Sequence, residues 1–265
     1  MIAMTIAGSD SGGGAGIQAD LKTFAALGVY GTSVITALTA QNTVGVQGVY
    51  PIPADFVAAQ LTSVLSDIDV AAIKIGMLAD VAVIDRLADM LAAVAVPVVL
   101  DPVMVATSGD RLVPDNAVAA LRDRLFGVAT IVTPNVPEAA VLLGTAAARG
   151  EAEMRQQALA LADRGPAILL KGGHLDGGES VDILCMDGRC ERLTSRRVAT
   201  RNTHGTGCTL SSAIAAYLAR GATLAEAVAG AKTYISKAIA AADDLDIGRG
   251  HGPVHHFHAL WQGVE

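Results

Sequence analysis

Short apolar runs alternate with longer amphipathic segments along most of the chain, and this alternation restricts the fold more than any other feature. The sequence predicts buried strands at 1–8, 32–42, 70–76, 96–101, 130–135 and 167–173. It predicts helices at 17–28, 54–67, 80–93, 116–125, 137–144, 151–164, 206–220 and 224–242. Strands that alternate with helices form a mostly parallel sheet covered by helices on both faces. We therefore expect a single α/β domain over residues 1–265.

The alternation breaks between Ser180 and Arg196, where two short β-rich runs flank the sequence MDGR. A glycine turn between such runs is typical of a β-hairpin. Cys185 and Cys190 lie on this hairpin, and we interpret them as structural residues because no further metal-ligating residues accompany them. Three cysteines, an odd number without clustering, fit a reducing cytoplasm better than a disulfide framework.

Composition excludes several classes of function. Apolar residues make up 52 % of the chain, and aromatic residues only 3 %, which favours an α/β core of aliphatic side chains. A net charge of -7 argues against a nucleic-acid or anionic-membrane partner. The longest apolar runs are too short to span a bilayer, and the first residues lack the pattern of a secretory signal. We expect a cytoplasmic protein.

Polar and glycine-rich segments follow the predicted strands, and in parallel α/β sheets ligands bind at these carboxyl ends. The segments are GSDSGGGAG, TAQN, KIGM, DPVM, TPNVPE and KGGH. None forms a Walker-type phosphate loop, and GSDSGGGAG (Gly8–Gly16) does not match the dinucleotide fingerprint. This loop is either a flexible turn or a place where a substrate approaches the backbone.

The segment from Gly205 to Cys208, GTGC, precedes a helix whose apolar face is visible in the sequence. That face consists of Leu210, Ala213, Ile214, Tyr217 and Leu218. The free N–H groups of GTGC would then form an anion hole, and its glycines would admit phosphate oxygens. The alternative is an ordinary helix start that buries a small cysteine.

Two carboxylates and one lysine follow other strands. Asp101 and Glu138 could order Mg²⁺ and its water ligands, or could serve as a turn cap and a first-turn helix acid. Lys171 ends a buried strand, where an unpaired ammonium is costly, so we expect a phosphate or carboxylate partner. Three histidines among His251–His258 lack the spacing of a zinc site, and we expect this segment to pack against the sheet.

The segments AGSDSGGGAGIQADLKT, TALTAQNT, IKIGML, LDPVM, PNVPEA, KGGH and NTHGTGCTLSSAIAA occur in this order across nearly the whole chain. Together they resemble the bacterial hydroxymethylpyrimidine/phosphomethylpyrimidine kinases of thiamine biosynthesis, in the ribokinase superfamily. The resemblance implies a ribokinase-like domain that binds ATP at the carboxyl edge of the sheet. It also implies phosphorylation of 4-amino-5-hydroxymethyl-2-methylpyrimidine, then of its monophosphate, and a homodimer.

The resemblance also assigns roles to individual residues. It implies that Gln41 bonds the pyrimidine, that Met77 and Val103 contact its ring, and that the loop with Gly14 closes near the substrate. Asp101 and Glu138 would hold Mg²⁺, directly or through water. The residues expected along the ATP phosphates are Asn135, Lys171 and Thr206, and those expected at the transferring phosphoryl group are Gly205, Gly207 and Cys208.

Cys208 distinguishes this sequence from the sugar kinases and many pyridoxal kinases of the superfamily, which have an aspartate there that acts as a base. Our hypothesis is that a helix N-terminus lowers the pKa of the thiol, so that a thiolate serves the alcohol step. A neutral thiol would then tolerate the charged acceptor of the second step, which a carboxylate would repel. Two alternatives remain: a pyridoxine or pyridoxal kinase of the same superfamily, and a non-catalytic regulator that binds a nucleotide or precursor.

Overall fold

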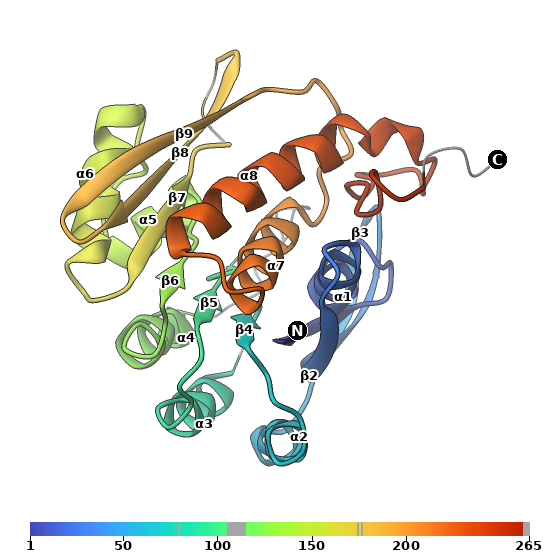
Figure 1. The fold of residues 1–265 in the computed structure, drawn as a ribbon, viewed down its shortest axis with the longest axis vertical. Coiled ribbons are helices and arrows are strands. Elements are labelled where there is room, and N and C mark those ends of the chain that lie inside the picture. The colour runs from blue at the N-terminus through green and yellow to red at the C-terminus, as the bar shows by residue number, and fades with distance from the viewer. Residues whose placement is uncertain (79, 105–114, 174, 176, 262–265) are drawn as a thin grey trace.

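The computed structural model of the protein describes residues 1–78, 80–104, 115–173, 175 and 177–261 (Figure 1). In this part of the chain, one nine-stranded sheet has the order β3-β2-β1-β4-β5-β6-β7-β8-β9. Its strands are β1 (Ile2–Asp10), β2 (Tyr30–Asn42), β3 (Gly45–Pro51), β4 (Ala72–Ile75), β5 (Val98–Leu100), β6 (Ile131–Val132), β7 (Ala167–Lys171), β8 (Glu179–Met186) and β9 (Arg189–Arg196). The six central strands, β2, β1, β4, β5, β6 and β7, pair in parallel. The outer strands β3, β8 and β9 are antiparallel to their neighbours.

Helices cover both faces of this sheet, which confirms the predicted α/β class (Figure 1). One face carries α1 (Gly16–Ala26), α7 (Thr206–Ala219) and α8 (Leu224–Ala240). The other carries α2 (Ala54–Leu65), α3 (Val81–Leu91), α4 (Asp115–Ala120), the π-helix η1 (Leu121–Leu125), α5 (Val136–Leu143) and α6 (Glu151–Ala162). A 3₁₀ turn, η2 (Ala242–Asp244), follows α8. Each face of the sheet thus has its own apolar core.

The central strands explain why the sheet is buried on both faces. Every residue of β4, β5 and β6 is buried, and almost all of them are apolar. Continuous apolar strands are the usual pattern of a parallel sheet between two helical layers. Lys74 of β4 is the exception, and its side chain has no exposed surface.

Several element boundaries differ from the predicted ones. The strand β3 was not predicted, because it contains two glycines and ends at Pro51, and because none of its residues is buried. The strand β1 continues to Asp10, and β6 has two residues instead of the six predicted. The predicted start of the helix after GTGC is confirmed, since α7 begins at Thr206 with Gly205 as its N-cap.

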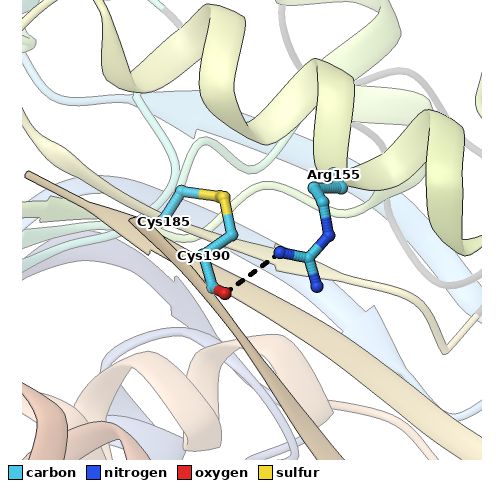
Figure 2. The surroundings of a disulfide bond; sticks show 3 residues. All are labelled: Arg155, Cys185 and Cys190. Carbon is cyan, nitrogen blue, oxygen red and sulfur yellow. Dashed lines mark hydrogen bonds between the residues drawn. A yellow bond between two sulfur atoms is a disulfide. The ribbon is translucent and has the colours of Figure 1, made fainter. Parts of the chain in front are cut away.

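The predicted hairpin is present as β8 and β9, with Asp187 and Gly188 in the turn at φ values of 50° and 71°. Positive φ at both positions is the requirement of a tight hairpin turn. The expectation of reduced cysteines in this hairpin is wrong: Cys185 and Cys190 lie opposite each other with Cα atoms 4.1 Å apart, and they form a disulfide (Figure 2). The cross-strand register, which composition does not reveal, brings the two sulfur atoms together.

The guanidinium of Arg155 on α6 donates to the carbonyl oxygen of Cys190 at 3.0 Å, which ties the hairpin to the neighbouring helix (Figure 2). Cys208 is a free thiol. No helix in the described ranges is long and apolar enough to cross a membrane.

Candidate active site

A cavity of about 710 Å³ lies at the carboxyl ends of the parallel strands. Its lining includes Gln41 from β2 and Arg196 from β9, so it follows this edge of the sheet across the central strands. The first turn of α7 faces the cavity between these two ends. A volume of this size suits a small-molecule substrate.

The cavity brings together all but one of the predicted site residues. These are Gln41, Met77, Asp101, Val103, Asn135, Glu138, Lys171, Gly205, Thr206, Gly207 and Cys208. Gly14 is the exception, because it does not line the cavity, and its backbone instead packs against Gly205 and His204. His174 of the KGGH motif lies outside the described residues.

Two helix N-termini converge on Cys208. The thiol lies in the first turn of α7, and its sulfur accepts a hydrogen bond from the backbone N–H of Gly16, the first residue of α1. Helix N-termini carry partial positive charge and unpaired N–H groups. The N-terminus of α1 therefore adds positive partial charge beside the predicted anion hole, which the sequence had assigned to α7 alone.

The protonation of Cys208 differs from our expectation. Burial raises the pKa of its thiol to about 11, although the Lys74 ammonium and the Gly16 N–H both act to lower it. Removal of the thiol from water outweighs the effect of the helix N-termini. Without ligands, Cys208 is therefore a neutral thiol at pH 7, and not the thiolate that we had expected.

Lys171 forms an ion pair with the buried Asp101 at the ends of β7 and β5. The Lys171 ammonium lies 2.9 Å from Asp101 Oδ1, which also accepts from the Thr133 hydroxyl. Burial opposes ionisation of Asp101, but the ammonium groups of Lys171 and Lys74 keep its pKa below the ordinary value. The expected carboxylate partner of Lys171 is thus Asp101.

Glu138 occupies the first turn of α5, where it forms a capping box with Asn135. The Asn135 side chain accepts from the Glu138 N–H at 2.9 Å, and Glu138 Oε2 accepts from the Asn135 N–H at 2.7 Å. Burial raises the pKa of Glu138 to about 7. The residue is therefore a helix-capping acid that also lines the cavity, so the structure combines the two roles that the sequence had left open.

The end of the cavity at β2 contains the amide of Gln41. Its Oε1 accepts from the Thr39 hydroxyl at 3.1 Å, and its Nε2 lies 3.4 Å from His204 Nε2. Met77 and Val103 supply apolar surface to the same cavity. An amide beside an apolar wall can recognise a flat ring that has both a hydrogen-bond donor and an acceptor.

Sequence reasoning missed a contact between the side chains of His204 and Asp10, whose atoms Nε2 and Oδ2 are 2.9 Å apart. The Asp10 carboxylate also accepts from the N–H groups of Gly12, Gly14 and Ala15. It thereby holds the glycine loop in shape and connects that loop to the segment before GTGC. The sequence contained a signal for this contact, because Asp10 is the one charged residue in GSDSGGGAG and His204 directly precedes GTGC.

The histidine-rich segment packs mainly against helices α7 and α8, and it meets the sheet where the His251 N–H donates to the carbonyl oxygen of Thr43, between β2 and β3. His256 Nε2 lies 3.0 Å from the Thr209 hydroxyl, and the Tyr234 hydroxyl donates to the His256 carbonyl oxygen at 2.6 Å. Burial lowers the pKa of His256 to about 3, so its ring is neutral. The segment therefore supports the helix that carries Cys208.

Sequence comparison assigns the family. The family model described as phosphomethylpyrimidine kinase matches residues 10–255. The chain belongs to the phosphomethylpyrimidine kinase family. It is 57 % identical over 262 residues to the hydroxymethylpyrimidine/phosphomethylpyrimidine kinase of Rhizobium meliloti, and the match covers 98 % of each chain.

Solved structures extend this comparison. The Bacillus subtilis pyridoxal kinase in complex with ADP has a TM-score of 0.90 and 38 % identity, with 97 % of this chain and 98 % of that chain covered. The phosphomethylpyrimidine kinase of Clostridium difficile has a TM-score of 0.80 and 43 % identity, with 90 % of this chain and 99 % of that chain covered. The phosphomethylpyrimidine kinase family thus shares its fold with a pyridoxal kinase.

Proposed function

We propose that this chain transfers the γ-phosphoryl group of ATP to 4-amino-5-hydroxymethyl-2-methylpyrimidine, and then transfers a second one to the resulting monophosphate, in thiamine biosynthesis. Membership of the phosphomethylpyrimidine kinase family supports both steps. The observation that carries the proposal is the position of Cys208, where the N-termini of α1 and α7 meet inside the cavity. Amide groups that are fixed before the reaction stabilise charge on a transferring phosphoryl group.

In this proposal the pyrimidine binds at the β2 end of the cavity. Gln41 bonds the amino group and ring nitrogen, and Met77 and Val103 contact the ring. The hydroxymethyl group, or the phosphate that replaces it, then points toward Cys208. Gly14 does not contact the substrate in this proposal, and its backbone instead packs against Gly205 and supports that residue.

ATP occupies the other part of the cavity, with its phosphates beside Asn135, Lys171 and Thr206. The apolar side chains of Ile235 and Ile239 line the cavity from α8 and offer a surface for the adenine. This arrangement places the γ-phosphoryl group between Lys171 and the N–H groups of Gly205–Cys208. Positioning and charge neutralisation account for most of the catalysis in phosphoryl transfer.

Asp101 and Glu138 are the residues that would hold Mg²⁺, directly or through water. Their chemistry fits, because both are oxygen donors and because the buried Glu138 retains a raised pKa that a divalent cation would lower. No group of three or more His, Cys, Asp or Glu in the described residues is arranged to hold a metal by itself. Bound Mg²⁺ would neutralise phosphate charge, and the phosphates would supply its remaining ligands.

The neutral Cys208 thiol suits both acceptors. In the alcohol step, the hydroxyl proton becomes acidic as its oxygen bonds to phosphorus, so the requirement for a base is modest. The hydroxyl proton can pass to an oxygen of the transferred phosphoryl group, so the neutral Cys208 does not have to take it up. In the second step the acceptor oxygen is already ionised, and a neutral thiol does not repel it.

The likeness to a pyridoxal kinase gives a second candidate, phosphorylation of pyridoxine or pyridoxal. A flat pyridine ring of similar size could occupy the same end of the cavity. Relative values of kcat/KM for the three acceptors distinguish the candidates, and we expect the pyrimidine to be preferred. A non-catalytic regulator would bind the pyrimidine without consuming ATP.

We also propose that the protein is a cytoplasmic homodimer, since ATP is its phosphoryl donor and since one edge of the sheet is exposed and apolar. The exposed side chains at this edge are Tyr30, Leu38, Val44, Val49 and Tyr50. Edge strands with apolar surface are prone to pair with another copy. Light scattering should give twice the monomer mass, and Val49→Lys should shift it toward the monomer.

Product analysis tests the central proposal. Wild-type protein with ATP, Mg²⁺ and the hydroxymethylpyrimidine should yield the monophosphate first and then the diphosphate. Lys171→Met should reduce kcat by about 10²–10³-fold, the range for loss of one preorganised charge-stabilising group. Arg192→Met is the matched control, because Arg192 pairs with Glu151 and Glu179 at the surface and does not line the cavity. Failure of the wild-type protein to consume ATP would overturn the proposal.

A further inference from the structure

Lys74 is a fully buried lysine in the centre of the sheet. It lies on β4, between β1 and β5, and its side chain has no exposed surface. A β-carbon placed on Gly76 would lie 2.7 Å from Lys74 Nζ, so the side chain extends along its strand toward the carboxyl edge. The ammonium therefore reaches the edge of the sheet that carries the cavity.

The Asp20 carboxylate of α1 holds this ammonium in place. Lys74 Nζ lies 2.9 Å from Asp20 Oδ1 and 2.8 Å from Oδ2. The hydroxyls of Thr5 and Ser212 each donate to the same carboxylate at 2.6 Å. All four residues are buried, so the carboxylate is saturated with hydrogen bonds from three other elements.

The pair is also connected to the site through the packing of α1 on α7. Gly16 and Asp20 are one turn apart on α1, and Cys208 and Ser212 are one turn apart on α7. The Gly16 N–H bonds the sulfur of Cys208, and one turn further along Ser212 bonds Asp20. These two contacts join α1 to α7 and place the Lys74–Asp20 pair one helical turn from Cys208.

The ion pair is oriented, with its positive end toward the cavity. Lys74 lines the cavity and Asp20 does not. The Lys74 charge lowers the pKa of Cys208 more strongly than the Asp20 charge raises it. Lys171 and Lys232 also line the cavity, paired with Asp101 and Asp182 respectively, and Lys171 is the residue that we place at the ATP phosphates.

We propose that Lys74, held by Asp20, is a positioning residue that favours the second phosphorylation by presenting positive charge to the phosphate of the monophosphate acceptor. The inference rests on the proposed function. In that step an oxygen of the acceptor phosphate bonds to the γ-phosphorus, the bond from phosphorus to the bridging oxygen of ADP breaks, and no proton need be removed. The acceptor brings a charge of about −2 into a buried site, whereas the alcohol of the first step is neutral.

Three variants change the charge of the pair in steps, and a fourth is the control. Lys74→Gln leaves the carboxylate without its cation, and Asp20→Asn leaves the ammonium without its anion. Lys74→Gln together with Asp20→Asn removes both charges and retains hydrogen-bonding amides, so this double variant should fold. Ser212→Ala is the matched control, since it removes a hydrogen bond to Asp20 and leaves both charges. Folding is checked by melting temperature and by binding of ADP.

The measurement is kcat and KM for the alcohol and for the monophosphate, each supplied separately. We expect KM for the monophosphate to rise at least tenfold in the double variant, to rise further in Lys74→Gln, and not to rise in Asp20→Asn. KM for the alcohol should change less than threefold in all four variants. The control Ser212→Ala should lower the melting temperature but leave the ratio of the two KM values constant. Equal changes for both acceptors, or changes that follow melting temperature in place of charge, would overturn the inference. Wild-type protein that forms neither product would instead refute the proposed function.

Discussion

The backbone of Gly14 fills the space that a side chain on Gly205 would need. The nearest atom to a β-carbon placed on Gly205 is the carbonyl oxygen of Gly14, and Gly205 itself has a φ of 79°. The glycine loop after β1 and the N-cap of α7 therefore meet backbone to backbone. This contact explains how Gly14, which does not line the cavity, supports Gly205, which does.

Gly205→Ala should destabilise the protein, because the methyl group would clash with rigid backbone and would force a left-handed residue. The left-handed conformation alone costs about 1–2 kcal/mol for a residue with a β-carbon. Thermal unfolding should show the loss, together with reduced activity.

Gly207→Ala is the matched comparison. Its β-carbon would lie 3.4 Å from Lys171 Nζ and 3.5 Å from Asp101 Oδ2, which is ordinary contact. We expect stability to be kept and phosphoryl transfer to fall, because the methyl group enters the cavity at the ion pair. Equal melting temperatures for Gly205→Ala and Gly207→Ala would show that the contact between Gly14 and Gly205 is not the cause of the lost stability.

Glu138 should make the ligand-free protein less stable as pH rises from about 4.5 to about 7. Its pKa is about 7 in the folded protein and 4.5 as its ordinary value, so the folded state binds the extra proton in this window. Stability falls across this window because the unfolded state loses this proton while the folded state keeps it, and the fall ends once the buried carboxyl ionises. In the wild type, the melting temperature should fall as pH rises from 5 to 8, and the steepness of this fall is the slope to be compared.

Glu138→Gln provides the control, because glutamine can also complete a capping box. The slope should be smaller in this variant. ATP with Mg²⁺ should also reduce it in the wild type, because a cation near the carboxylate favours its ionised form. A slope that persists in Glu138→Gln would assign the effect to another group.

Cys208→Asp should damage the second phosphorylation more than the first. An aspartate adds a negative charge where the N-termini of α1 and α7 meet, and it repels the charged acceptor of the second step. Separate rates with the alcohol and the monophosphate measure the difference, and Cys208→Ser is the neutral control. Equal losses in both steps would contradict the charge argument.

The disulfide between Cys185 and Cys190 predicts a simple labelling pattern. Denatured protein should take up one alkyl group without reductant and three after reduction, since the chain has three cysteines. Reduction should lower stability by about 2 kcal/mol, the chain-entropy value for so small a loop. Three alkyl groups without reductant would show that Cys185 and Cys190 remain free thiols. The control Cys208→Ala should take up one alkyl group fewer, both with and without reductant.

Sequence periodicity was sufficient for the α/β class and for the start of α7. Both follow from the local direction of successive side chains, which repeats every 2 residues in a strand and every 3.6 in a helix. The residues of the cavity could be proposed for the same reason, since parallel strands deliver their carboxyl ends to one edge. The edge strand β3 was missed because it has no buried face to produce such a pattern.

Tertiary structure alone decided which of these residues touch. The disulfide depends on the register of β8 and β9, and the neutral state of Cys208 depends on how deeply α1 and α7 bury it. Lys74 and Asp20 are 54 positions apart, so no local pattern relates them. The sequence by itself determined most of the helices and strands and the edge of the sheet where the chemistry lies. Packing between distant segments decided charge, protonation and contact, because these depend on burial and on distances that only the folded chain defines.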